Sequence, residues 1–144
     1  DRTDHLQRLI KAHESLDADA TLLVKEMENP KQHGVIEAEE IGSETYKVNR
    51  AVEKPEKPPS KLAIMPIYSF KPAILQAIER TRLGVGGEIQ LTDAVQILIE
   101  SGSRVYAIKL KPEEVRLDVG TPETYWEALQ ISHEYAMMEK PSKL

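Results

Sequence analysis

Cysteine is absent from this chain of 144 residues, and basic residues are fewer than acidic ones. Without cysteine, neither a disulfide nor a thiolate metal site can form, which fits a reducing cytoplasm. The 19 lysines and arginines stand against 24 acidic residues, so the formal net charge is −5 and argues against nonspecific nucleic-acid binding. Any phosphate site must therefore be local, built from a few cations and backbone amides.

Long apolar runs are also absent. No stretch approaches the length of a membrane span, and the N-terminus lacks the pattern of a signal peptide. We therefore expect a soluble, cytoplasmic protein that has no membrane partner. The hydrophobic share of 40% and the charged share of 30% are values of a globular chain, and the length suits one domain.

The first elements of the chain indicate its class. Apolar residues spaced by three or four positions predict an amphipathic helix between Leu6 and Leu16, and the apolar run Ala20–Val24 predicts a buried strand. A helix followed by a strand is typical of a layered α/β architecture. Because no strand precedes the helix, we expect the chain to begin within a larger unit.

The remaining elements follow from the same signals. A turn around Gly42 joins two of the strands, and a proline-rich exposed loop, Lys54–Lys61, precedes the next. Thr121 is expected to cap the last helix, with Pro122 at its first position. We predict strands over Val35–Glu37, Tyr46–Glu53, Leu62–Tyr68, Val105–Leu110 and Arg116–Asp118, and helices after Lys71 (inner face Ile74, Leu75 and Ile78), over Ile89–Glu100 and after Thr121.

Three separate segments carry the chemistry: VEKP (Val52–Pro55), GEIQLTD (Gly87–Asp93) and LDVGTPE (Leu117–Glu123). Each places acids, a lysine or a glycine turn at the end of a predicted element. The ends of strands are where α/β folds bind phosphorylated ligands. As a set, the segments predict a site for such a ligand.

Glu53 and Lys54 leave the end of a strand in opposite directions, ahead of a proline. A carboxylate there can accept hydrogen bonds from neighbouring sugar hydroxyls, and the ammonium group can hold a phosphate as a point charge. Taken alone, such a pair is common at strand ends and is usually solvated.

The segment Gly84–Glu88 has three glycines in four positions, which lets the backbone approach a ligand and adopt positive φ. The following helix could direct its first amides at an anion. A flexible connection between two helices, with Glu88 or Thr92 as a cap, explains the pattern equally well.

Asp118 reaches a glycine turn from a short predicted strand. A carboxylate in this place suits Mg²⁺, which takes one or two carboxylates and completes its shell with phosphate and water. The alternative is that Asp118 caps the helix or accepts from the amides of the turn.

In this order, the segments resemble the sugar-phosphate nucleotidyltransferases, a family that includes glucose-1-phosphate uridylyltransferases and thymidylyltransferases. The resemblance extends from Leu6 to Ala136. Its segments are NPKQHGVIE (Asn29–Glu37), VEKPEKPPSKLAIMPIY (Val52–Tyr68), GGEIQLTDA (Gly86–Ala94) and LDVGTPETY (Leu117–Tyr125). It implies an α/β fold with a mixed, mostly parallel sheet flanked by helices, part of a Rossmann-like nucleotide-diphospho-sugar transferase fold. Residues 1–138 would form that domain portion and residues 139–144 a tail.

The resemblance also implies roles for single residues. Gly34 would offer a backbone amide to a sugar hydroxyl, Glu53 would bind ring hydroxyls, and Lys54 would hold the 1-phosphate. Ile64 would line the sugar pocket, Glu88 would lie on the sugar side, and Asp118 would be a carboxylate ligand of Mg²⁺. The implied substrates are a sugar 1-phosphate, glucose 1-phosphate first, and UTP or dTTP, and the products are a nucleotide sugar and pyrophosphate.

The family begins with a strand and a glycine-rich loop that carries an arginine and a lysine, and this sequence contains neither. We therefore expect a C-terminal portion of the domain, inactive by itself, with open sheet edges that favour a homo-oligomer. The rival interpretation is a non-catalytic regulatory or binding subunit of the same fold. Glu53, Lys54 and Asp118 favour the enzyme, because a scaffold has no need of converging charges.

Overall fold

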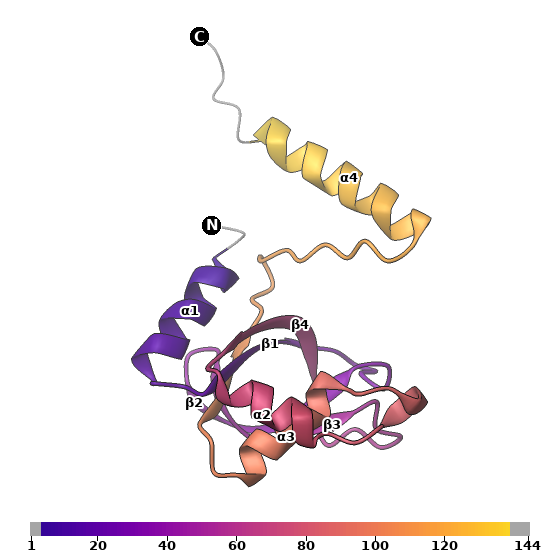
Figure 1. Ribbon diagram of the computed structural model, residues 1–144. Coiled ribbons are helices and arrows are strands. Elements are labelled where there is room, and N and C mark those ends of the chain that lie inside the picture. The colour runs from indigo at the N-terminus through magenta and orange to yellow at the C-terminus, as the bar shows by residue number, and fades with distance from the viewer. Residues whose placement is uncertain (1–3, 139–144) are drawn as a thin grey trace. The chain divides into compact units, whose positions relative to one another are not determined.

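The computed structural model describes residues 4–138, and the chain divides after Glu114 into two compact units (Figure 1). The expected tail, residues 139–144, lies outside the described residues. No helix within residues 4–138 is long and apolar enough to cross a membrane.

The first unit contains five strands and most of the helices. Its elements in chain order are α1 (His5–Ser15), β1 (Ala20–Glu26), β2 (Gly34–Gly42), β3 (Thr45–Glu53), β4 (Leu62–Phe70), α2 (Ala73–Arg80), the short 3₁₀ helix η1 (Val85–Gly87), α3 (Leu91–Glu100) and β5 (Val105–Lys109). The predicted helices and strands of this unit are therefore confirmed, with ends that differ by a few residues.

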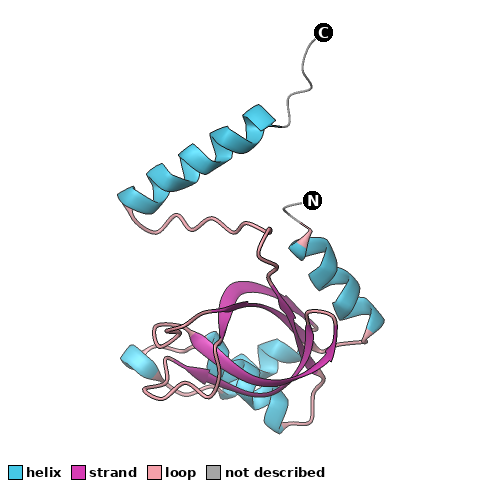
Figure 2. Ribbon diagram, turned by 180° about the vertical axis from the view of Figure 1, so that it is seen from behind, coloured by secondary structure: helices cyan, strands magenta, loops and turns pink. Residues whose placement is uncertain are grey.

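The strands form one mixed sheet that closes on itself in the order β1-β4-β2-β3-β5, with β5 pairing again with β1 (Figure 2). Only the β1–β5 pair is parallel; β1–β4, β2–β3, β2–β4 and β3–β5 are antiparallel. The expected α/β class, the mixed sheet and the flanking helices are confirmed, but the expectation of a mostly parallel sheet is wrong. A two-residue turn between β2 and β3 forces that pair to run antiparallel.

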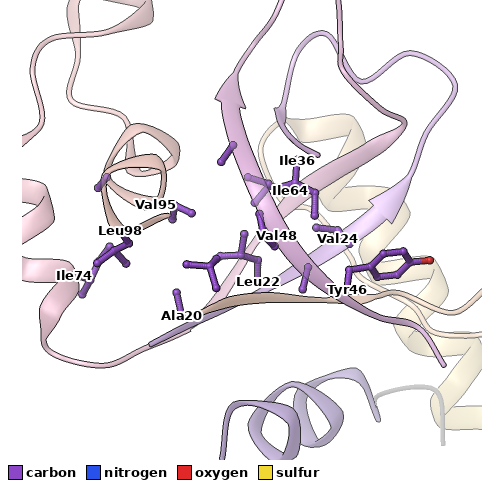
Figure 3. Close-up of a cluster of buried hydrophobic side chains, with 14 of the residues drawn as sticks. Ala20, Leu22, Val24, Ile36, Tyr46, Val48, Ile64, Ile74, Val95 and Leu98 are labelled. Atoms are coloured by element: carbon purple, nitrogen blue, oxygen red, sulfur yellow. The ribbon is translucent and has the colours of Figure 1, made fainter. Parts of the chain in front are cut away.

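The main core lies between the sheet and α2 and α3. Leu22 of β1 is fully buried, and Val95 and Leu98 of α3 pack towards it (Figure 3). Ile74 and Ala77 supply the buried face of α2. The predicted inner face of that helix is wrong at Leu75, which is 63% exposed, because a helix repeats every 3.6 residues and Leu75 lies beyond the edge of the buried stripe.

A smaller apolar cluster lies under α1. Leu9 of this helix packs with Leu23, Ala63 and Met65, which project from β1 and β4, and with Leu110 after β5. Burial on both faces explains why the first five residues of β1 are all buried and mostly apolar, without the alternation of a half-exposed strand.

The second unit contains α4 (Pro122–Met138) and the extended segment before it. The Oγ1 atom of Thr121 accepts a hydrogen bond from the N–H of Thr124 at 3.2 Å, so the predicted cap is confirmed. The expectation of a short strand over Arg116–Asp118 is wrong, because this segment has no strand partner among the described residues.

Candidate active site

A pocket of about 220 Å³ opens where β2 begins, β3 ends and α3 begins, with β4 forming one side. We call it the Glu53 pocket. Its lining residues are Gln32, His33, Gly34, Glu53, Ile64, Pro66, Tyr68, Gln90, Leu91 and Thr92. Three predicted site residues, Gly34, Glu53 and Ile64, thus meet in one cavity although they come from three different strands.

Strand pairing explains why Gly34 and Glu53 meet. Gly34 opens β2 and pairs directly with Glu53, the last residue of β3. A Cβ atom on Gly34 would lie 2.6 Å from Oγ1 of Thr92, 3.0 Å from Cδ1 of Ile64 and 3.1 Å from Oε2 of Glu53. A side chain at this position would therefore displace the polar groups of the pocket, and only glycine leaves the room they need.

The carboxylate of Glu53 is held in place by Thr92 in the first turn of α3. The Thr92 hydroxyl donates a hydrogen bond of 2.6 Å to Oε2, and the Glu53 side chain is only 11% exposed. A short hydrogen bond to a largely buried carboxylate fixes its orientation. The sequence suggested Thr92 only as a helix cap, but the residue at the cap position is Gln90, without a side-chain cap bond.

Lys54 lies at the end of β3, next to the Glu53 pocket but not among its lining residues. Its Nζ is 3.9 Å from Oε1 of Glu53, and its side chain is 42% exposed. Its φ of 41° is in the left-handed region, and its N–H donates to the carbonyl of His33 at 3.0 Å. This backbone costs about 1–2 kcal/mol for a residue other than glycine, and it turns the chain sharply after the strand.

Asp93 adds a second acid beside Glu53. Burial, and then the negative charge of Glu53, raise the pKa of the Asp93 carboxyl above its usual value. The carboxyl group also packs against Gly84, where a Cβ atom would lie 2.5 Å from Oδ2. Asp93 is not a lining residue of the Glu53 pocket, but it adds negative charge near Glu53, which disfavours an anion there.

The glycine-rich segment before α3 has the expected backbone. Gly86 and Gly87 have φ values of 77° and 73°, a conformation that glycine adopts without strain. Glu88, predicted on the sugar side, is exposed and is not a lining residue of the Glu53 pocket. Its carbonyl accepts from the N–H of Gly84 at 2.9 Å, which closes the loop. Its role in substrate binding stays a prediction.

Asp118 belongs to the second unit, so its predicted convergence with Glu53 and Lys54 also stays a prediction. Its side chain is 64% exposed, and Oδ1 lies 3.2 Å from Nη2 of Arg116. Within residues 4–138, no group of three or more acids, histidines or cysteines could hold a metal ion. One exposed carboxylate nevertheless fits Mg²⁺, which often takes a single protein carboxylate beside phosphate oxygens and water.

Comparison with known proteins matches residues 2–134 to the family model described as nucleotidyl transferase. The nucleotidyltransferase Agl11 of Haloferax volcanii, named for low-salt glycan biosynthesis, is 37% identical over 92% of this chain and 35% of its own length. The UTP–glucose-1-phosphate uridylyltransferase AglF of the same organism is 34% identical over 88% of this chain and 50% of its own length. The chain thus spans half or less of these relatives.

A solved UDP-glucose pyrophosphorylase in complex with UDP-glucose superposes with a TM-score of 0.81 at 28% identity, over 91% of this chain and 50% of the other. A UTP-bound enzyme of Acinetobacter baumannii, at 24% identity and a TM-score of 0.71, shares the fold.

Proposed function

The chain belongs to the nucleotidyl transferase family, and we propose that it supplies the sugar-phosphate site of an enzyme that joins a sugar 1-phosphate to a nucleoside triphosphate. Among the relatives are UTP–glucose-1-phosphate uridylyltransferases, which favours glucose 1-phosphate and UTP as the substrates, with dTTP as the other nucleotide. The products would be a nucleotide sugar and pyrophosphate.

The sugar would occupy the Glu53 pocket. Because Thr92 holds Oε2 of Glu53, the orientation of the carboxylate is set before a ligand arrives, and Oε1 can accept from ring hydroxyls. Gly34 leaves the backbone open to close approach, and its amide would donate to a hydroxyl. Ile64 supplies an apolar surface for the carbon face of the ring.

The phosphate would lie towards Lys54. The acids Glu53 and Asp93 repel an anion that lies close to them, whereas the Lys54 ammonium is exposed just after the strand end. The site therefore gives the two ends of a sugar phosphate different environments, hydrogen-bond acceptors for the ring and positive charge for the phosphate.

In the proposed reaction, a phosphate oxygen of the sugar 1-phosphate attacks the α-phosphorus of the nucleoside triphosphate. The bond between the α-phosphorus and the bridging oxygen to the β-phosphate breaks, and pyrophosphate leaves. The chain's part is to position the nucleophile and, through Lys54, to stabilise negative charge. A bound Mg²⁺ would neutralise charge on the phosphates, with Asp118 as one ligand.

The single observation that carries this proposal is the Glu53 carboxylate, fixed by Thr92 in a pocket that only a glycine at position 34 leaves open. Titration calorimetry of the chain with glucose 1-phosphate tests it. We expect Glu53→Gln to weaken binding at least tenfold, because a charge-assisted hydrogen bond is lost, about 1.5–3 kcal/mol. Glu56→Gln, at an exposed glutamate in the next loop, is the matched control. If both variants bind glucose 1-phosphate equally well, the sugar does not occupy this pocket.

We expect no turnover from these 144 residues alone, because the chain spans half or less of Agl11 and AglF. Release of pyrophosphate from UTP or dTTP in the presence of glucose 1-phosphate and Mg²⁺ measures this directly. Activity above a protein-free control would contradict the expectation, while the binding experiment judges the sugar site independently.

A further inference from the structure

A second pocket, of about 250 Å³, opens where β1 and β5 end, beside the turn between β2 and β3. We call it the Glu114 pocket. Its charged lining residues are three lysines and three glutamates: Lys25, Glu26, Glu44, Lys109, Lys111 and Glu114. Glu44 lies in the hairpin turn, whereas the Glu53 pocket lies at the opposite, open end of the same hairpin. The two pockets share no lining residue, so the Glu114 pocket is distinct from the proposed sugar site.

Glu114 is the most unusual group here, a carboxylate whose side chain is only 1% exposed. Its Oε2 accepts from the N–H of Lys111 at 2.9 Å and lies 3.5 Å from Nη1 of Arg8. Its Oε1 is buried and has no hydrogen-bond donor among the described residues. Among these residues, Nη1 of Arg8 is also buried without a hydrogen-bond partner, and its ion pair is with Oε2. Because a buried carboxylate oxygen without a donor is unfavourable, a donor from outside the chain would stabilise Oε1.

Glu44 presents a second acceptor in the same pocket. Its Oε2 is buried and forms no hydrogen bond within residues 4–138; its nearest cation is Nζ of Lys109, at 3.5 Å. Lys109 also lies 3.7 Å from Oε2 of Glu26, so one ammonium is shared between two acids. The N–H of Lys109 donates to the Glu44 carbonyl at 2.8 Å, which fixes the turn against β5.

Two further lysines supply positive charge that is not neutralised locally. Lys25 is exposed at the end of β1, and Lys111 follows β5 and is half-buried. Neither ammonium group has an ion-pair partner in the described part of the chain. The pocket thus combines buried acceptors without donors and accessible cations without anions.

We propose that the Glu114 pocket binds a small zwitterion, whose ammonium group donates to Glu114 and Glu44 and whose anionic group pairs with Lys25 and Lys111. The three lysines and three glutamates of the lining balance in charge, and Arg8 beside Glu114 adds one positive charge, which suits a ligand that carries an anionic group as well as an ammonium group. The volume corresponds to roughly eight water molecules, so the ligand is small. Its anionic end is a phosphate, as in an aminoalkyl phosphate, or a carboxylate, as in an amino acid.

An NMR titration of the ¹⁵N-labelled chain tests the proposal, with phosphoethanolamine as the phosphate zwitterion and 4-aminobutyrate as the carboxylate zwitterion. We expect the amide signals of Glu44 and of residues 109–114 to shift, while those of Gly34 and Glu53 stay in place. The tighter of the two compounds identifies the anionic group. Ethanolamine carries only the ammonium group and inorganic phosphate only the anionic group, so each should bind at least tenfold more weakly at equal ionic strength.

Two variants test which residues bind the ammonium group and the anionic group of the ligand. Glu114→Gln should weaken binding of the tighter zwitterion at least tenfold, and a melting curve shows whether the variant is folded. Lys25→Gln changes an exposed side chain that the fold does not need, and it should weaken binding at least threefold. Lys57→Gln, at an exposed lysine in the loop after β3, is the control without effect.

The proposal is overturned if neither zwitterion shifts the signals of residues 109–114, which would leave water as the occupant. Equal binding of inorganic phosphate and phosphoethanolamine would also overturn it, as would unchanged affinity in both Glu114→Gln and Lys25→Gln.

Discussion

Gly34→Ala is the substitution that examines the Glu53 pocket most directly. The new Cβ atom would lie 2.6 Å from Oγ1 of Thr92 and 3.1 Å from Oε2 of Glu53, the two atoms joined by the hydrogen bond of the pocket. Contacts this short force one of these side chains to move. We therefore expect the methyl group to break that hydrogen bond rather than to fill empty space.

The magnitude follows from two opposing effects. Loss of a hydrogen bond to a charged, largely buried group costs about 1.5–3 kcal/mol. Replacing a glycine by alanine stabilises the fold by about 0.4–1 kcal/mol where alanine can adopt the same backbone conformation, because the unfolded chain then has less conformational entropy. Gly34 is such a position as far as its φ is concerned, since this angle is not positive. The net loss is about 1–2 kcal/mol, which lowers the melting temperature of a domain of this size by about 5 °C.

Gly42→Ala is the matched control, because Gly42 ends the same strand, has no positive φ, and would give its Cβ atom no neighbour within 4 Å. It should be neutral or slightly stabilising. Differential scanning calorimetry of both variants gives the stability, and titration with glucose 1-phosphate gives the binding, which should fall at least tenfold in Gly34→Ala alone. If the two variants melt alike and bind alike, the close packing around Gly34 has no functional meaning.

Two further substitutions examine the neighbours of Glu53. Thr92→Val should cost about 2 kcal/mol in a urea unfolding experiment, because the carboxylate loses its donor; Thr92→Ser keeps the hydroxyl and should retain most of the stability. For Asp93, the folded-state pKa is raised, so its contribution to stability is present below the unfolded-state pKa, about 3.9, and is lost as the pH rises through the folded-state pKa. Asp93→Asn should therefore be more stable than the unchanged chain at neutral pH, and this advantage should vanish in acid; a difference independent of pH would contradict the assignment.

Local signals were enough to predict most elements of the first unit. The apolar spacing from Leu6 predicted α1, and the helix expected after Lys71 is α2. These signals act over a few residues, so the sequence states them directly. The pairing of strands depends on contacts between distant segments. The expectation of a mostly parallel sheet came from resemblance, although the short turn after Gly42 already required an antiparallel pair.

The candidate site was predictable only in part, because its residues also come from segments that are distant in the sequence. Gly34, Glu53 and Ile64 line one pocket, and their roles in sugar binding stay predictions. Only the resemblance suggested that they belong together, since nothing in their spacing shows that β2, β3 and β4 lie side by side there. Thr92 was missed as a partner of Glu53. A threonine in the first turn of a helix is usually explained as part of a cap, and its true partner lies 39 positions earlier in the chain.

The distribution of charge around the Glu53 pocket determines how a sugar phosphate can enter it. Two unit charges 4 Å apart interact by about 4 kcal/mol at an effective dielectric constant of 20. A phosphate beside the Glu53 carboxylate is therefore repelled, whereas a phosphate on the exposed side of the Lys54 ammonium is attracted. Burial, and then the negative charge of Glu53, raise the pKa of Asp93, so a second carboxyl group adds to the acidity near Glu53. A neutral, hydroxyl-bearing ring meets no such penalty, and its hydroxyls are the donors that a fixed carboxylate requires. Charge thus favours the orientation that we propose, with the ring at Glu53 and the phosphate at Lys54, before any contact specific to one sugar is considered.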